Sequence, residues 1–301
     1  GPFSSEVLRV NIFGSSGVRD IVDRRFLQLA LAIGLAMGEE YRSVIVGYDT
    51  RTSADAVRSA FISGLLSAGS RVYDAGILPT PALAYIAREF DAGAMVTASH
   101  NPPEYNGIKL LNPDGSGFGA EQRTKIEERL FTELLATASW EEMQRLRRYP
   151  RCLEKYIKRV CQDFPGKLKV KVVVDCGCGA ASVVTPYLLK RLGCEVITLH
   201  CYPSGYFPRR IEPTLENLST LVAVVKAAGA DLGLAHDGDG DRLAVVDEKG
   251  DWVSGDKLLC LLALNAKAEK IVTTVDASLV LDELGFEVTR VLSLIHISEP
   301  T

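Results

Sequence analysis

The sequence lacks the features that mark several classes of protein. No stretch of about eighteen apolar residues occurs, so the sequence predicts no membrane-spanning helix. The formal net charge is -4 and no long run of basic residues occurs, which argues against nucleic acid as a partner. The opening residues Gly1–Ser5 carry no charged segment followed by an apolar one, so they predict no secretory signal. Together these absences predict a cytoplasmic protein.

Cysteine is present in an arrangement that gives little support to disulfides or zinc. There are 7 cysteines, an odd number, and only Cys176 and Cys178 are close in sequence, with no second pair at a zinc-like spacing. We therefore expect free thiols in a reducing compartment. The 301 residues are 47% apolar and 24% charged, without a low-complexity tract, which predicts a globular chain of two domains or slightly more.

The most informative stretch is residues 92–111. It begins as a short apolar run that predicts a buried strand. Pro102 and Pro103 can continue neither a strand ladder nor a helix interior, so the residues before them are held on a stiff turn. These turn residues are Ser99, His100 and Asn101.

The second half of this stretch predicts a return toward the sheet. Asn106-Gly107 predicts a tight turn, and Ile108–Leu111 predicts a strand that carries Lys109. A hydroxyl, an imidazole and an ammonium group are thus expected on one loop. A hairpin with an ordinary polar tip remains an alternative at this point.

A second motif places three carboxylates, Asp237, Asp239 and Asp241, at alternate positions separated by glycines. Such a loop can fold around one ion, and its hard oxygen ligands suit Mg²⁺ or Ca²⁺. An EF-hand is excluded because Arg242 stands where that loop requires glycine and because the flanking segments predict strands. A solvated acidic turn is the other alternative, although three carboxylates so close together repel one another without a cation.

Two further loops could contact a ligand. Phe13–Asp20 is glycine-rich, so Ser15, Ser16 and Arg19 could meet a phosphate, or the segment could be a plain surface turn. Cys176–Gly179 resembles a phosphate loop in composition, but a tight turn between a strand and a helix explains it equally well. We assign it no catalytic role.

Strands and helices alternate along the chain, which predicts an α/β fold of three-layer α/β/α units with mixed, largely parallel sheets. Ligands bind outside the carboxyl ends of strands in such sheets, and Ser99 lies at such an end. The expected strands cover residues 43–47, 71–74, 92–96, 170–175, 195–199, 232–235, 243–246, 271–275 and 287–292. The expected helices cover residues 26–39, 54–66 (capped by Ser53), 79–90, 121–135, 140–147, 152–160, 180–192, 254–264 (capped by Ser254) and 278–284.

Thr97–Pro102 followed by Tyr105–Lys109 resembles the active-serine loop of the α-D-phosphohexomutases, a family that includes phosphoglucomutase, phosphomannomutase and phosphoglucosamine mutase. Asp237–Arg242 is similar to the metal loop of that family, and Phe13–Asp20 to its entry loop, although Asp20 replaces the usual glycine. Asp49 and Arg51 resemble a further family segment, and their expected role is an ion pair that pins the turn beside the serine loop.

The resemblance implies a role for each site residue. Ser99 would carry a phosphoryl group, with His100, Lys109 and Arg19 as its catalytic neighbours. Ser16, Asn101 and Arg242 would contact phosphate or substrate. The implied metal ligands, for Mg²⁺, are Asp237, Asp239, Asp241 and the phosphorylated Ser99.

The resemblance also implies the reaction and the domain organisation. A phosphohexomutase interconverts hexose or hexosamine 1-phosphates and 6-phosphates through a phosphoserine, with a glucose 1,6-bisphosphate-type activator. The expected divisions are residues 1–150, 151–252 and an incomplete third unit, 253–301, whose end, 293–301, fits no family continuation. The later sugar and phosphate motifs of the family do not occur, so we expect a fragment with little activity.

Two other functions remain open. The first is a Mg²⁺-dependent sugar-phosphate phosphatase in which an aspartate attacks, and the second is a non-catalytic binding fragment.

Overall fold

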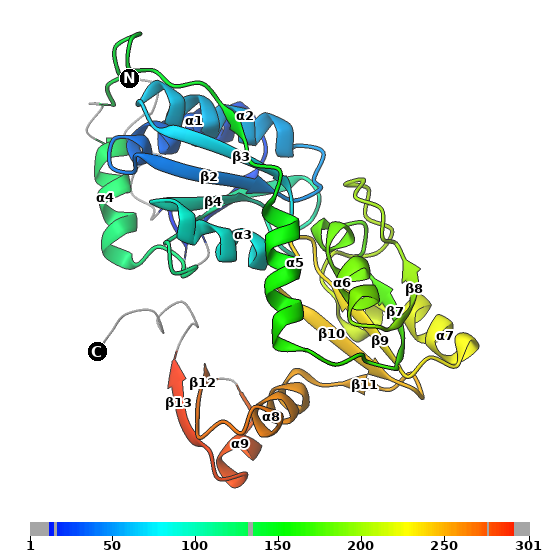
Figure 1. Ribbon diagram of the computed structural model, residues 1–301. Helices are drawn as coiled ribbons and strands as arrows, with labels where there is room; N and C mark the ends of the chain where they lie inside the picture. The colour runs from blue at the N-terminus through cyan, green and yellow to red at the C-terminus, as the bar shows by residue number, and fades with distance from the viewer. Residues whose placement is uncertain (1–11, 15–16, 132–134, 276, 292–301) are drawn as a thin grey trace.

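The computed structural model describes residues 12–14, 17–131, 135–275 and 277–291, and within them three β-sheets are flanked by helices (Figure 1). The first sheet has the order β1-β5-β4-β2-β3-β6. Its strands are β1 (Val18–Ile21), β2 (Ser43–Tyr48), β3 (Arg71–Ile77), β4 (Ala92–Val96), β5 (Tyr105–Leu111) and β6 (Arg147–Arg148). Strands β4, β2, β3 and β6 pair in parallel, whereas β5 is antiparallel to both β4 and β1.

Helices cover both faces of this first sheet. They are α1 (Arg24–Gly38), α2 (Ala54–Ser67), α3 (Thr80–Ile86), η2 (Ala87–Glu89) and α4 (Ala120–Phe131). Val44 and Val46 of β2 face a core built with α1, α2 and α4, while Ile45 between them faces the core under α3. This alternation is the period of a strand buried on both faces, so the predicted three-layer arrangement is confirmed.

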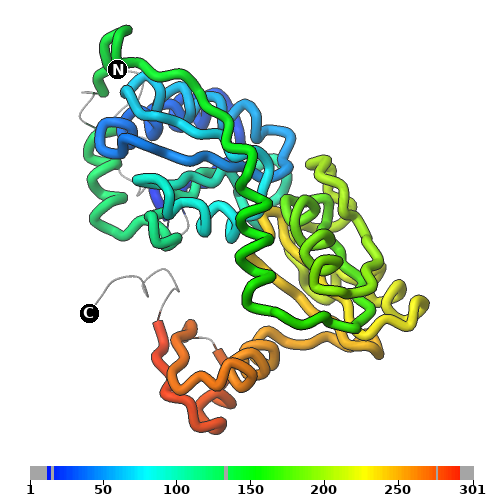
Figure 2. Tube along the Cα trace, in the orientation of Figure 1, coloured from blue at the N-terminus to red at the C-terminus, as the bar shows by residue number. Residues whose placement is uncertain are grey.

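The second sheet has the order β11-β10-β9-β7-β8 and carries the acidic motif on the turn between β9 and β10. Its strands are β7 (Lys171–Asp175), β8 (Glu195–Leu199), β9 (Leu232–His236), β10 (Leu243–Asp247) and β11 (Trp252–Val253). Its other elements are α5 (Cys152–Asp163), η3 (Ala180–Val183), α6 (Thr185–Arg191), η4 (Leu215–Asn217) and α7 (Ser219–Ala228). Figure 2 shows the chain descending from the first sheet through α5 into the second.

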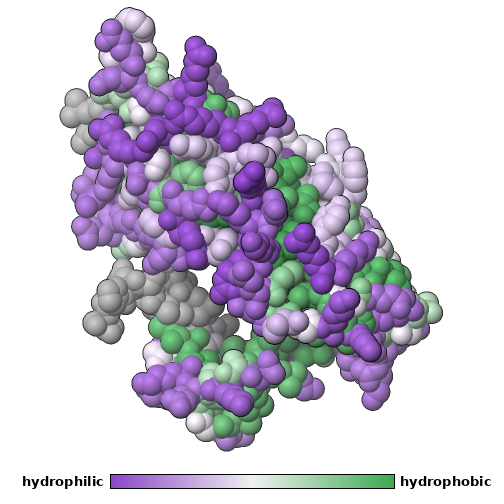
Figure 3. Space-filling model, viewed as in Figure 1, coloured by the Kyte–Doolittle hydropathy of each residue, from purple (hydrophilic) through white to green (hydrophobic). Residues whose placement is uncertain are grey.

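A third, smaller group of elements follows. Strands β12 (Lys270–Thr274) and β13 (Glu287–Val291) form a parallel pair, accompanied by α8 (Gly255–Asn265) and α9 (Val280–Glu283). Ser254 caps α8 as predicted, by accepting a hydrogen bond from the Lys257 backbone N–H. Figure 3 shows apolar residues on the surface of this group, and exposed members include Leu261, Leu262, Leu264 and Leu279.

The predicted tight turn at Asn106-Gly107 is wrong. Both residues lie inside β5, where they pair with β1, and the chain reverses earlier, around the two prolines. Gly107 is needed there because a Cβ atom would lie 2.4 Å from the Val18 carbonyl oxygen and 2.6 Å from that of Thr97. Close strand packing, and not a turn, explains this glycine.

Three predictions about helices also fail. Residues 140–147 form turns and a short strand, and Trp140 is 82% exposed, because no surface is there to cover an apolar face. The single helix expected over 180–192 is divided at Val184, just before the first turn of α6, which contains a proline. Ser53 does not cap α2, since its hydroxyl instead accepts a hydrogen bond from Asn106 Nδ2 at 3.0 Å.

The remaining sequence expectations concern thiols and membranes. All seven cysteines are free, as predicted. Among the described helices, none combines the length and the apolar character needed to cross a bilayer.

Candidate active site

Ser99 lies on a short turn directly after β4 and is 3% exposed. Its φ of 55° is in the left-handed region, which few residues other than glycine adopt. The Thr97 hydroxyl fixes this turn by accepting a hydrogen bond from the Ser99 N–H at 2.9 Å and donating to Asp49 Oδ2 at 2.6 Å. As a result, Ser99 Oγ is directed at the second sheet and donates to Asp237 Oδ2 at 3.0 Å.

Arg51 fixes the serine turn through its guanidinium group. Its guanidinium is fully buried, forms an ion pair with Asp49 at 3.1 Å and donates to four backbone carbonyls of the loop. Those carbonyls, at 2.6–3.1 Å, belong to Pro102, Tyr105, Ser99 and Asn101. The expected ion pair is therefore present, and it satisfies carbonyl groups that the reversal of the chain leaves without strand partners.

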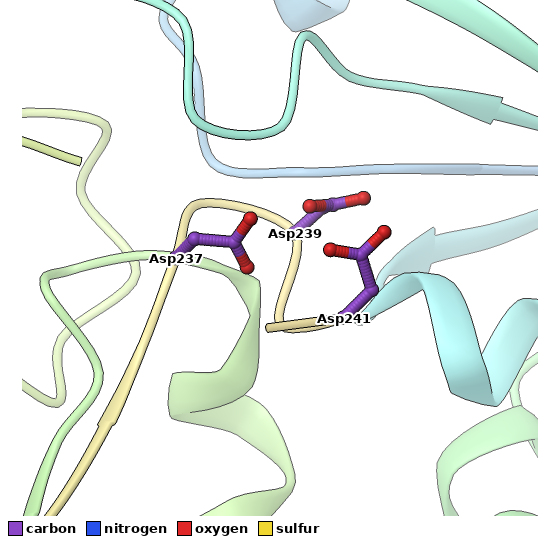
Figure 4. Close-up of side chains that lie close together, drawn as sticks. All are labelled: Asp237, Asp239 and Asp241. Atoms are coloured by element: carbon purple, nitrogen blue, oxygen red, sulfur yellow. The ribbon is translucent and has the colours of Figure 1, made fainter. Parts of the chain in front are cut away.

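The three aspartates converge on the turn between β9 and β10 (Figure 4). One carboxylate oxygen from each lies within 4.8 Å of the others. Asp237 and Asp239 are buried, whereas the Asp241 side chain is 33% exposed. Lys109 from β5 completes the cluster, with its Nζ 2.6 Å from Asp239 Oδ2 and 2.9 Å from Asp241 Oδ2.

The charges in this cluster perturb one another strongly. Burial, followed by the charges of Asp239 and Asp241, raises the pKa of Asp237 to about 8. Burial alone would lower the pKa of Lys109, but the two facing carboxylates outweigh it and raise that pKa. Burial likewise acts to raise the pKa of Asp239, yet the neighbouring Lys109 ammonium lowers it. Lys109 is thus held as a charged donor.

The cluster fits a divalent cation. Asp239 Oδ1 is buried and has no hydrogen-bond partner among the described residues, although its other oxygen accepts from Lys109 and from the Thr80 hydroxyl. An unpartnered buried carboxylate oxygen is costly unless a cation meets it. Three carboxylates offer the hard oxygen donors that Mg²⁺ prefers.

Four other predicted residues surround the serine. Arg19 of β1 donates from Nη1 to Asn101 Oδ1 at 3.1 Å, and its buried Nε has no partner among the described residues. His100 Nδ1 lies 3.5 Å from Ser99 Oγ, and burial together with Arg242 lowers the pKa of this imidazole. The Arg242 N–H donates to Asp237 Oδ1 at 3.2 Å. Ser16 lies outside the described residues.

The guanidinium of Arg242 turns to a carboxylate that sequence reasoning did not single out. Its Nη1 lies 2.8 Å from Glu212 Oε1, at the side of a cavity of 960 Å³. The cavity runs between the serine turn and residues 205–217, and its walls include His100, Asn101, Arg210 and Glu212. The groove thus reaches His100 and Asn101, the two residues that follow Ser99.

Three residues of the site escaped sequence analysis. Thr80 and Thr97 act through hydroxyl groups whose partners are far away in sequence, and Glu212 meets Arg242 only through folding. A signal existed for Thr80, because it lies between two prolines after a strand, where side chains reach the carboxyl edge of the sheet. His236 precedes the acidic turn, with hydrogen bonds to the Arg242 carbonyl and to Thr185.

Comparison with known proteins assigns the class. Residues 10–136 match the family described as phosphoglucomutase/phosphomannomutase, alpha/beta/alpha domain I, and residues 153–250 match its alpha/beta/alpha domain II. A probable phosphoglucosamine mutase of Methanococcoides burtonii is 44% identical over 278 residues, covering 91% of this chain and 64% of that protein.

Solved structures agree. A phosphoglucomutase/phosphomannomutase family protein from Burkholderia thailandensis has a TM-score of 0.82 at 30% identity, covering 93% of this chain and 66% of the other. An N-acetylphosphoglucosamine mutase of Aspergillus fumigatus, solved with glucose 1,6-bisphosphate, shares the fold at a TM-score of 0.52 and 15% identity, covering 93% of this chain and 62% of the other. The chain belongs to the phosphoglucomutase/phosphomannomutase family, and it spans less than two thirds of the length of these relatives.

Proposed function

We propose that this chain is the phosphoryl-carrying part of a Mg²⁺-dependent phosphohexomutase. The observation that carries the proposal is the meeting of Ser99 Oγ with Asp237, 3.0 Å apart, at the edge of a three-carboxylate cluster. A serine alone is a weak nucleophile, but here its oxygen lies beside groups that can bind a phosphoryl group. We also propose that the chain is divided into three domains, which cover residues 1–150, 151–252 and 253–301.

Ser99 would carry the transferable phosphoryl group. In the forward step, a hydroxyl oxygen of the sugar forms a bond to phosphorus while the bond between phosphorus and Ser99 Oγ breaks. The resulting bisphosphorylated sugar turns over and returns its other phosphoryl group to Ser99. A glucose 1,6-bisphosphate-type activator would load the serine at the start. Such transfer depends mainly on positioning and charge stabilisation.

The surrounding residues supply that stabilisation. Asp237, Asp239 and Asp241 would hold Mg²⁺, which supplies positive charge beside the phosphoryl oxygens when it is bound. The Arg19 guanidinium, one nitrogen of which lacks a partner among the described residues, suits a phosphoryl oxygen. Asn101 orients Arg19, and the Arg242 guanidinium meets Glu212 at the wall of the groove, where a substrate phosphate could compete for it.

His100 fits the role of proton acceptor better than Lys109. The lysine is engaged by two carboxylates, so it has no free lone pair to offer, whereas the imidazole lies beside Ser99 Oγ. The proton of the attacking sugar hydroxyl would pass to a ring nitrogen of His100. His100 would then pass this proton to the departing Ser99 Oγ, and would take it up again when Ser99 attacks the other phosphoryl group.

The proposed substrates are hexose or hexosamine phosphates, without a choice among glucose, mannose and glucosamine. Neither nucleic acid nor a membrane is part of the proposal. We propose a cytoplasmic location, where free thiols such as the seven in this chain persist.

The test is phosphoryl transfer to the chain from glucose 1,6-bisphosphate in the presence of Mg²⁺. We expect one acid-stable phosphate, mapped to Ser99 by peptide analysis and absent from Ser99→Ala. An acid-labile acyl phosphate on an aspartate would instead identify a phosphatase. Binding of the sugar phosphate without any covalent phosphate would identify a binding fragment, and either result would overturn the proposal.

A further inference from the structure

The cysteines that are close in sequence are not the ones that meet in space. Cys176 follows β7 and Cys201 follows β8, and these strands are parallel neighbours in the second sheet. Both side chains belong to one apolar cluster, in which Cys201 Sγ also donates to the Val174 and Leu199 carbonyls at 3.4 and 3.3 Å. The register pairs Asp175 with Leu199, so Cys201 stands one position beyond the residue opposite Cys176. With strands about 4.8 Å apart and a rise of about 3.3 Å per residue, such a diagonal pair lies within the range of Cα separations that a disulfide can span.

The two thiols differ in the way expected of a reactive pair. Cys176 is completely buried, whereas Cys201 is partly exposed, so a reagent can reach only Cys201. The neighbouring Cys176 thiol lowers the pKa of Cys201, while the neighbouring Cys201 thiol and burial raise the pKa of Cys176. A partly exposed thiol with a lowered pKa beside a buried partner is typical of a nucleophilic and a resolving cysteine.

We infer that Cys176 and Cys201 are a site of reversible oxidation, at which the two cysteines become joined to each other by a disulfide bond. The oxidant is a small-molecule disulfide such as oxidised glutathione. The Cys201 thiolate attacks one sulfur of the oxidant and releases the first small thiol. Cys176 then gives up its proton and attacks the Cys201 sulfur, which releases the second. The protein loses two hydrogens and two electrons, and the oxidant gains them as two thiols.

We expect the disulfide to alter the geometry of the acidic cluster. The turn that begins at Cys176 packs against the cluster, since the Ala180 N–H donates to the Gly238 carbonyl at 2.9 Å. A Cβ atom on Gly179 would lie 2.8 Å from the same carbonyl oxygen, so the turn already packs tightly against Gly238. Gly238 stands between two of the carboxylates. Closing the bond brings the two sulfur atoms to covalent distance, and we expect the turn that carries Cys176 to shift with it.

The first test uses the full 301-residue chain incubated with oxidised glutathione. We expect the mass to fall by two hydrogens, with peptide mapping that joins Cys176 to Cys201 and with reversal by dithiothreitol. Cys201→Ser should prevent the disulfide, whereas Cys178→Ser, on the same turn, should leave it unchanged. A disulfide that joins Cys178 to Cys201, or no disulfide at excess oxidant, would overturn the inference.

The second test measures Mg²⁺ binding by calorimetry before and after oxidation, and it rests on the proposed metal site. We expect affinity to fall about tenfold or more, as it does when groups behind a metal ligand are disturbed. The Cys201→Ser variant should bind Mg²⁺ with the same affinity before and after treatment with oxidised glutathione. Unchanged binding in the disulfide-linked protein would overturn the link to the acidic cluster. Absence of Mg²⁺ binding in the reduced protein would count against the proposed function and leave the mapped disulfide standing.

Discussion

Two turns of this chain, residues 97–101 and 176–179, are built alike and used differently. Each follows a buried strand of a parallel pair, β4 in the first sheet and β7 in the second. Each contains a non-glycine residue in the left-handed region, Ser99 with φ 55° and Cys178 with φ 57°. The first turn presents a side chain to the cluster, whereas the second supports the cluster with its backbone.

The same pair of residue types anchors both turns. Asp49 with Arg51 holds the first, and Asp175 with Arg209, at 3.0 Å, holds the second. Arg51 is sealed from solvent and donates hydrogen bonds to the serine loop and Asp49, and its guanidinium lies over the Phe207 ring at 5.7 Å. Arg209 donates to the His236 carbonyl at 2.7 Å, immediately before the acidic turn. The comparison teaches that one anchor fixes the turn of Ser99 and the other fixes the turn of the three aspartates.

The largest expected effect comes from breaking the first anchor. Arg51→Ala would leave the Asp49 carboxylate buried without its charge partner and four carbonyls without donors. The expected loss in free energy of unfolding is about 3–5 kcal/mol. Arg209→Ala should cost less, about 1.5–3 kcal/mol, because Asp175 also meets His200, which is partly exposed, and the Gly177 N–H. Denaturant unfolding of both variants measures the difference.

Arg159→Ala is the matched control for these two variants. Its partner, Asp163, lies four residues away on α5, and both side chains are solvent-exposed. Such pairs contribute about 1 kcal/mol at most. An Arg51→Ala variant no less stable than Arg159→Ala would show that the carbonyls of the serine turn do not depend on this guanidinium.

How much of this could be predicted from sequence depends on the range of each interaction. The strands, the α/β class and the spacing of the aspartates are local patterns, and the serine motif is long enough to be matched to its family. The Arg209 anchor and the contact of Cys176 with Cys201 join residues 25 or more positions apart, and no local pattern marks them. Gly107 misled because a glycine serves a turn and a tight strand crossing equally well.

The second prediction uses pH to test the acidic cluster without a divalent cation. The pKa of Asp237 is raised to about 8, against about 3.9 in an unfolded chain, so between these values the folded state binds the extra proton. Stability therefore falls as pH rises, by up to about 1.4 kcal/mol per pH unit. The pKa values of His100 and His236 are lowered, and their effect is opposite below about 6.5, so the window is pH 7 to 8.

Urea unfolding in EDTA at several pH values across that window provides the measurement. Asp237→Asn carries no titrating group at this position and should show a flat profile. Saturating Mg²⁺ should also flatten the profile of the unmodified chain, because a bound cation favours the ionised carboxylate. An equal slope in Asp237→Asn would mean that another group titrates here.

The smallest effect concerns the two left-handed residues and separates strain from function. A left-handed conformation destabilises a residue with a Cβ atom by about 1–2 kcal/mol. Glycine avoids this strain but loses more conformational entropy on folding, which offsets about 0.5–1 kcal/mol of the gain. Cys178→Gly should thus stabilise the chain by up to about 1 kcal/mol in denaturant unfolding. Ser99→Gly gains the same relief but loses the hydrogen bond to Asp237, so it should be near neutral while abolishing phosphorylation. Cys178→Ala and Ser99→Ala retain the Cβ atom and should show no relief. If Cys178→Gly is no more stable than Cys178→Ala, the left-handed conformation at that turn carries no strain. The similar conformation of Ser99 could then not be interpreted as a loss of stability that positions the hydroxyl.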